Sequence, residues 1–184
     1  MKRLKRDKQE LYRIVREYGA DVLKSEAFRA GCGQRHHIVT TVTVHSRKVA
    51  MYTVLICRKL KELGIETDER SIVRAALCHD LGMVGRREKF RNNSECSKKH
   101  PIDSVKLARE IYPDMNERME NAIRWHMWPM VPHMPATSEE IILIMADKLA
   151  SLGDMFKYSG RRFRRLIHRG REYVTLPKKK GPLL

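Results

Sequence analysis

Histidine and aspartate residues at widely separated positions are the side chains in this sequence that could carry chemistry. Imidazole and carboxylate groups are suitable ligands for zinc, manganese or iron. Asp147 directly follows the apolar residues 141–146, and burying a carboxylate on such a face is costly unless it is paired or bound to metal. The candidates are His45, the adjacent His79 and Asp80, His100, His126 and Asp147. Taken singly, each histidine also fits a core residue bonded to backbone, and each aspartate fits a partner of Arg or Lys. Their occurrence together favours a metal site.

Helices are expected to position these side chains, because apolar residues recur at helical spacing through most of the chain. Helices are predicted over about residues 11–18, 41–63, 68–80, 101–111, 113–126 and 137–152, with a short one at 161–168. A further helix is predicted to start near residue 25. The β-branched run 38–44 favours a strand by propensity alone, yet the residues from Thr41 onward follow a helical face. Asp68 is a predicted N-cap, Thr137 and Glu140 form a predicted capping box, and residues 84–98 are predicted to form a loop.

The order of these residues resembles the HD-domain superfamily of metal-dependent phosphohydrolases over roughly residues 34–155. The segments that carry the resemblance are residues 44–50, 75–82, 99–105, 123–129 and 145–151. The His-Met-Trp-Pro segment at 126–129 and the Asp-Lys pair at 147–148 look like a bacterial subgroup. The resemblance implies an all-α, HD-domain-like helical bundle with a metal site between helices.

The resemblance also implies roles for individual residues. The shared metal ligands would be His45, His79, Asp80 and Asp147. His100 and His126 fall where two-metal members place two further histidines, and Asp80 would then bridge the ions. One or two divalent ions (Fe, Mn, Zn or Co) would activate water for hydrolysis of a phosphoester, with Asp80, His100 and His126 as the catalytic residues. His100, His126 or a metal-bound water is the candidate acid for the leaving oxygen.

Basic residues near the His-Asp pair are the candidates for contacts with the substrate phosphate. Many members carry Lys shortly after the His-Asp pair, and here that position is Met83. The nearest cations are Arg86 and Arg87, which could donate bidentate bonds to phosphate or could be solvated loop charges. Lys148 could contact phosphate or pair with Asp147. Arg35 and His37, which precede His45 in the sequence, are further candidates to line the mouth of the site.

Charge and composition leave other functions open. The net charge is +16, but residues 1–17 contribute +4, residues 157–184 contribute +9 and the middle only +3. The basic C-terminus could bind RNA or another polyanion, which would make the chain a non-catalytic polyanion- or nucleotide-binding module. The resemblance to HD domains implies two further alternatives: a di-iron oxygenase with six ligands, and a degenerate HD domain that binds a nucleotide without cleaving it.

The expected organisation is a core domain with two flanking segments. Residues 1–33 are expected to form N-terminal helices on the core, 34–155 the metal-binding domain, and 156–184 a basic helix and tail. No apolar run approaches the roughly 18–20 residues of a membrane span, and no secretory signal is recognisable. The four cysteines form no C-x-x-C pair, Cys57 and Cys78 are expected to be buried thiols, and a cytoplasmic location is expected. The expected partner is a small phosphorylated substrate; the sequence does not indicate an oligomeric state.

Overall fold

The protein is a bundle of helices in the computed structural model, which describes residues 2–36 and 40–173, without the side chains of 2–5, 157 and 160–173. The helices are α1 (Lys2–Tyr18), α2 (Ala20–Lys24), α3 (Glu26–Ala30), α4 (Val42–Glu62), α5 (Glu69–Cys78), the 3₁₀ turn η1 (Leu81–Met83), α6 (Arg86–Lys89), α7 (Asn93–Ile111), α8 (Glu117–Trp125) and α9 (Ser138–Tyr173). Two short strands, β1 (Arg35–His36) and β2 (Thr40–Thr41), pair antiparallel. The predicted all-α architecture is confirmed.

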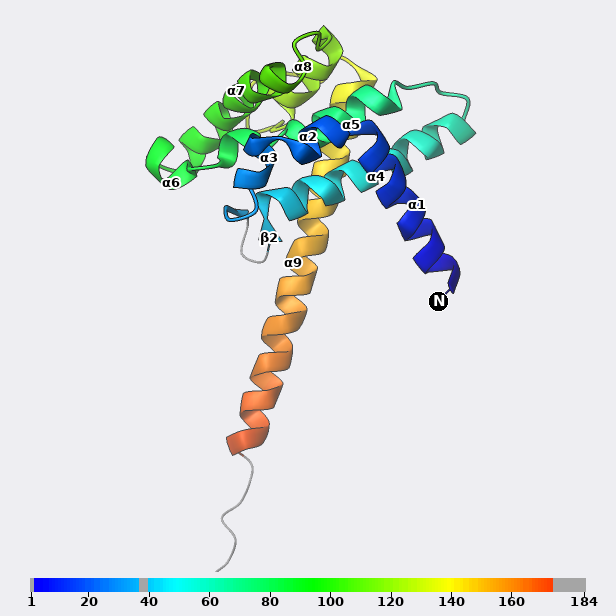
Figure 1. Ribbon diagram of the computed structural model, residues 1–184. Coiled ribbons are helices and arrows are strands. Elements are labelled where there is room, and N and C mark those ends of the chain that lie inside the picture. Colours follow the sequence, from blue (N-terminus) through cyan, green and yellow to red (C-terminus); the bar gives the residue numbers. More distant parts are fainter. Residues whose placement is uncertain (1, 37–39, 174–184) are drawn as a thin grey trace, which may run out of the picture.

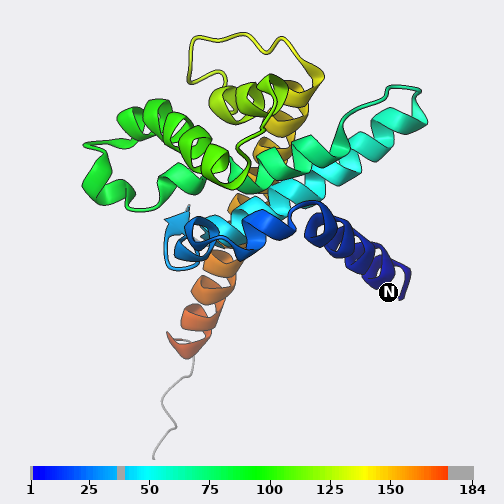
Figure 2. The ribbon, with the colours of Figure 1, turned by 45° about the horizontal axis from the view of Figure 1, so that its top comes forward.

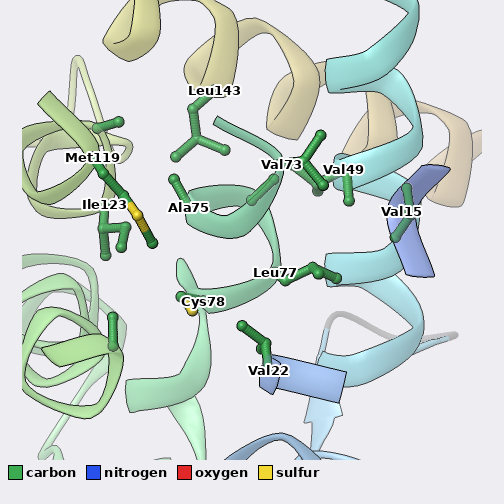
Figure 3. Close-up of a cluster of buried hydrophobic side chains, with 14 of the residues drawn as sticks. Val15, Val22, Val49, Val73, Ala75, Leu77, Cys78, Met119, Ile123 and Leu143 are labelled. Atoms are coloured by element: carbon green, nitrogen blue, oxygen red, sulfur yellow. The ribbon is translucent and has the colours of Figure 1, made fainter. Parts of the chain in front are cut away.

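Helix α5 lies at the centre of the core. Val73, Ala75, Leu77 and Cys78 are completely buried, so the helix is apolar around most of its circumference, as expected for a helix covered on all sides. It packs against α4, α7, α8 and α9, and against α1 and α2 (Figure 3). Its N-cap is Asp68, as predicted, whose Oδ1 accepts a bond from the Ser71 backbone N–H. The central position of α5 means that its C-terminal end is also surrounded by other helices.

The start of α4 resolves the conflict between strand propensity and helical periodicity. Thr40 and Thr41 form β2, and Thr41 is also the N-cap of α4, where its side chain accepts a bond from the Val44 backbone N–H. The predicted helix from this point is confirmed, because the buried face of Val42, Val49 and the residues after them outweighs the intrinsic preference of β-branched residues.

The prediction of a loop over residues 84–98 is wrong. α6 occupies residues 86–89, and α7 begins at Asn93, so Pro101 lies inside a helix rather than at its start. Asn92 caps α7 by accepting the Glu95 backbone N–H, and the Glu95 carboxylate accepts the Arg91 backbone N–H. These two bonds cap the start of the helix although the following residues are polar.

Helix α9 continues through the boundary expected at residue 155. Its first part packs on α4, α5 and α8, and its C-terminal part projects away from the bundle (Figures 1 and 2). One half of the predicted capping box is present, because the Glu140 backbone N–H donates to the Thr137 hydroxyl. The Glu140 carboxylate accepts the backbone N–H of Ala136 rather than that of Thr137. The separate helix expected at 161–168 is instead part of α9. The basic side chains expected to bind a polyanion lie largely outside the described side chains.

The four cysteines are free thiols, in agreement with the prediction from the sequence. Cys57 and Cys78 are buried as predicted, and Cys96 is also buried. Within the described residues, no helix combines the length and the apolar character that crossing a bilayer requires.

Candidate metal site

The six His and Asp residues singled out in the sequence converge between five helices. His45 lies in the first turns of α4, and His79 is the C-cap of α5, with Asp80 following it. The other three come from α7, the C-terminal end of α8, and α9: His100, His126 and Asp147. Each of the six is at most 7% exposed. A polar cluster this deeply buried requires internal pairing or a bound ion.

Asp80 lies at the centre of the cluster, and its two carboxylate oxygens face different histidines. Oδ1 lies 3.2 Å from His100 Nε2 and 3.7 Å from His126 Nε2. Oδ2 lies 2.8 Å from His36 Nε2 and 3.2 Å from His79 Nε2. This arrangement is suited to a carboxylate that bridges two neighbouring cations, one on each oxygen.

Asp147 completes the Oδ2 side of the cluster. Its Oδ1 lies 2.9 Å from His45 Nε2 and 3.9 Å from His79 Nε2. His45 Nε2 is also 4.0 Å from Asp80 Oδ2. We call His36, His45, His79 and Asp147 the first donor group, and His100 and His126 the second donor group. Asp80 is shared by both.

Hydrogen bonds to backbone carbonyls set the tautomers of three histidines. The Nδ1–H groups of His79, His100 and His126 donate to the carbonyl oxygens of Ala76, Cys96 and Ile123, at 2.8, 2.8 and 2.7 Å. A carbonyl can only accept, so Nδ1 carries the hydrogen and each Nε2 is directed to the centre of the site. Backbone bonds of this kind orient metal-binding histidines and fix their tautomers.

The second donor group shows why the site fits a cation. His100 Nε2 and His126 Nε2 lie only 3.1 Å apart. In their neutral forms both nitrogens present lone pairs, which repel unless a proton or a metal ion lies between or beside them. His79 Nε2 is buried and has no hydrogen-bond partner among the described residues. Neutral imidazoles with converging Nε2 atoms are the donors that divalent transition metals bind.

The burial and close spacing of these histidines shift the pKa values of His100 and His126 in opposite directions. Burial, together with the neighbouring His79 and His100, lowers the pKa of His126 to about 3. Burial also disfavours a charge on His100, but its bond to the charged Asp80 carboxylate and its bonds to Cys96 together outweigh burial and raise the pKa of His100 to about 9. Of the two histidines, His100 is therefore the one that carries a proton on Nε2 when no ion is bound.

The two carboxylates of the site remain ionised. Burial opposes their charge, but the surrounding imidazoles outweigh it and hold the pKa of Asp80 and the pKa of Asp147 well below the usual range. His45 is the counterpart: burial disfavours its charge, yet Asp147 and Asp154 raise its pKa to about 9. The site thus combines two fixed negative charges with histidines that can exchange a proton for a metal ion.

His36 is a site residue that the sequence did not single out. The two candidates named in this segment were Arg35 and His37; Arg35 is exposed, and His37 lies outside the described residues. Strand β1 alternates exposed and buried side chains, so His36 points inward, where it stacks on His45 with 4.0 Å between ring centroids. The antiparallel pairing of β1 with β2, His36 opposite Thr40 and Arg35 opposite Thr41, sets this register.

Replacing His36 with glutamine is expected to weaken binding of one ion about tenfold while leaving the fold intact, since losing one of several donors reduces affinity without emptying the site. The measurement is a competition titration with a chromogenic chelator and Zn²⁺. The control is Asp114→Asn, an exposed position outside both the site and strand β1. Unchanged affinity in His36→Gln would show that His36 is not a ligand.

Asp154 is a second residue that the sequence did not single out. It is buried in α9, about two turns beyond Asp147 and beyond the apolar run that drew attention to Asp147. Its Oδ2 lies 3.7 Å from His45 Nδ1, and its Oδ1 is bound by Lys48. A carboxylate behind a metal-binding imidazole orients the ring and makes it a better donor.

The Asp154→Asn variant is therefore expected to lose between about 10- and 100-fold in metal affinity, although Asp154 does not face the centre of the site. The same chelator competition measures the loss, with the exposed Asp114→Asn as the matched control. An affinity equal to that of the unaltered protein would exclude this orienting role.

A cavity of about 560 Å³ opens onto the cluster. Its lining includes Asp80, His100, His126 and Asp147, and two of the predicted substrate-binding cations, Arg86 and Lys148. Lys148 Nζ lies 3.3 Å from Asp147 Oδ2, so the ion pair considered from the sequence is present at the cavity wall. The third predicted cation, Arg87, lines a neighbouring cavity instead.

Two residues near the His-Asp turn shape this cavity. Met83 stands where the resemblance places a lysine; it is buried beside Cys96, so its thioether forms cavity wall and supplies no charge. Gly82 allows η1 to lie against α7, because a Cβ at Gly82 would come within 2.3 Å of the His100 carbonyl oxygen. The Gly82 backbone N–H also donates to Ser104 Oγ at 2.9 Å. These contacts hold Asp80 next to His100.

Comparison with known proteins agrees with this geometry. The sequence matches the HD domain family over residues 42–152, more than half of the chain, and the protein therefore belongs to that family. No curated protein and no solved structure matches the chain. The family generally contains hydrolases, and its members bind divalent metals. The matched segment includes the six residues singled out above, whereas His36 and Asp154 lie outside it.

Proposed function

We propose that this protein is a metal-dependent phosphohydrolase that cleaves a phosphoester of a nucleotide or another small phosphorylated compound. The observation that carries the proposal is the position of Asp80, with Oδ1 at the second donor group and Oδ2 at the first. Two ions held in this way would each have at least one carboxylate oxygen and two imidazoles.

The donor groups would divide the ligands between the ions. The first donor group with Asp80 Oδ2 would hold one ion, and the second donor group with Asp80 Oδ1 would hold the other. When bound, divalent ions in such a site lower the pKa of coordinated water and neutralise charge on phosphoryl oxygens.

The chain's own cations would bind and orient the substrate. Arg86 and Lys148 line the cavity over the donor groups, where a guanidinium can donate two parallel bonds to a phosphoryl group. Lys148 is about half exposed and paired with Asp147, so it can turn toward an incoming phosphoryl oxygen without leaving a buried carboxylate uncompensated, because Asp147 keeps its contact with His45.

The experiment is a phosphate-release screen. The protein is loaded separately with Mn²⁺, Co²⁺, Fe²⁺ or Zn²⁺ and assayed with phosphomonoesters, nucleotides and cyclic dinucleotides, using Asp147→Asn as the inactive control. Metal-dependent release that Asp147→Asn lacks would support the proposal. Absence of release by protein with a full complement of each metal would overturn it. Oxygen consumption by the iron-loaded protein, measured in parallel, would instead support the oxygenase alternative.

A further inference from the structure

A second cavity adjoins the metal site, and four arginines line it. Its volume is about 860 Å³, and its wall contains Arg35, Arg86, Arg87 and Arg91. Three residues, Arg86, Asn93 and Cys96, line both this cavity and the one over the donor groups. The two cavities therefore share a wall, and a ligand in one is next to the other. We call the second cavity the arginine pocket.

The arginine pocket carries positive charge that no ion pair among the described residues neutralises. No carboxylate is among the described residues that line it, and none of its four guanidinium groups is within ion-pair distance of a described carboxylate. The acids nearest in sequence are Glu88 and Glu95, and neither lines the pocket; Glu95 is bound to Lys99 and to the Arg91 backbone N–H. Like charges gathered around a concave surface repel one another and attract anions.

Segments from two parts of the chain build this pocket. Arg35 comes from β1, and the other three arginines come from α6 and the residue before the Asn92 cap of α7. Gln34 joins the two segments, because its Oε1 accepts the Gly85 backbone N–H at 3.0 Å. Gly85 has a φ of +75°, a conformation that suits glycine and turns the chain into α6. Arg86 Nη2 is held by Asn93 Oδ1 at 2.6 Å.

The size and chemistry of the two cavities indicate the kind of substrate. Cavities of roughly 300–1,000 Å³ hold whole small-molecule ligands, far more than one phosphoryl group needs. Guanidinium groups are the side chains best matched to phosphate oxygens, through paired N–H donors. A substrate with a single phosphate at the metal site would leave the arginine pocket without an anion.

We propose that the arginine pocket binds a second phosphate group of the same substrate, so that the substrate class is small molecules with two separated phosphate groups, one held at the metal site and one by Arg35, Arg87 and Arg91. This inference rests on the proposed phosphohydrolase function. Arg86, which lines both cavities, lies between the two phosphate positions and contributes to both. Hydrolysis at the metal site is then selective for compounds that also carry the distal phosphate.

Binding of matched ligands tests the proposal. The probes are straight-chain alkyl monophosphates and the corresponding α,ω-alkanediol bisphosphates, with two to eight carbons, titrated calorimetrically into the Mn²⁺-loaded full-length protein. The series covers a range of phosphate separations, and isolated phosphates avoid the strong metal chelation of pyrophosphate. We expect at least one bisphosphate to bind about tenfold or more tightly than its monophosphate. Equal affinity at every chain length would overturn the inference.

A charge-matched pair of variants assigns the effect to the pocket. The double variant Arg87→Gln/Arg91→Gln is expected to reduce the advantage of the bisphosphate to less than about threefold. The control, Arg13→Gln/Lys106→Gln, removes two exposed positive charges outside both cavities and is expected to keep the advantage. Retention of the advantage in Arg87→Gln/Arg91→Gln would overturn the inference.

The same titrations separate this inference from the proposed function. Metal-dependent binding of monophosphates without any bisphosphate advantage contradicts the second phosphate site but leaves the phosphohydrolase proposal standing. Binding of neither series, with metal bound, contradicts both.

Discussion

Replacing Asp80 with asparagine is expected to abolish tight binding of divalent ions and to lower any metal-dependent phosphate release by at least about 100-fold, more than the loss of an outer contact causes. Asp80 faces both donor groups, so its charge contributes to both ions. The asparagine side chain has the same shape but offers one neutral oxygen, and its NH₂ group would face histidine Nε2 atoms that have to receive a metal.

The Asp80→Asn experiment needs two measurements. Metal content after dialysis, determined by inductively coupled plasma mass spectrometry, reports the loss of ions directly. Thermal unfolding without metal shows whether the variant is folded, because removing a buried charge from a histidine cluster also changes stability. The exposed Asp114→Asn is the control and is expected to keep both ions. An Asp80→Asn protein that retains two ions per chain would contradict the bridging assignment.

Replacing His126 with alanine is expected to lower the metal content from two ions per chain to one and to reduce phosphate release on the order of 100-fold. His126 and His100 form the second donor group, and His126 is neutral at physiological pH because burial lowers its pKa to about 3. Its removal therefore takes away a donor without taking away a charge. The first donor group keeps its contacts and is expected to retain its ion.

A histidine outside the site provides the control for His126→Ala. His133 stacks on Trp125 and pairs with Glu140, and it lines neither cavity. His133→Gln keeps a hydrogen-bonding side chain at this position. It is expected to bind two ions. If the unaltered protein binds one ion, and His126→Ala also binds one, then the site is mononuclear and the second donor group has another role.

Local sequence pattern carried most of the information about the helices and about the ligand types. The N-cap at Asp68 and the capping hydroxyl of Thr137 depend on residues within one turn, so they could be predicted. The buried carboxylate of Asp147 was also predictable, because a charge within an apolar helix face requires a partner. The loop prediction over residues 84–98 failed because the cap formed by Asn92 and Glu95 outweighs the polarity of the residues after it and the proline at position 101.

The roles of His36, Asp154 and the arginine pocket depended on contacts between distant segments. His36 faces the site only because β1 pairs with β2 in one register, and a shift of one residue would direct Arg35 inward. Asp154 acts on His45 across 109 positions of the chain, and Arg35 joins three arginines some 50 residues later through the bond from Gly85 to Gln34. Residue types and helical periodicity determined which groups could bind metal and phosphate, since those properties are local. Packing of the helices decided which groups meet, since the free energy of burying α5 at the centre favours one arrangement of the segments around it.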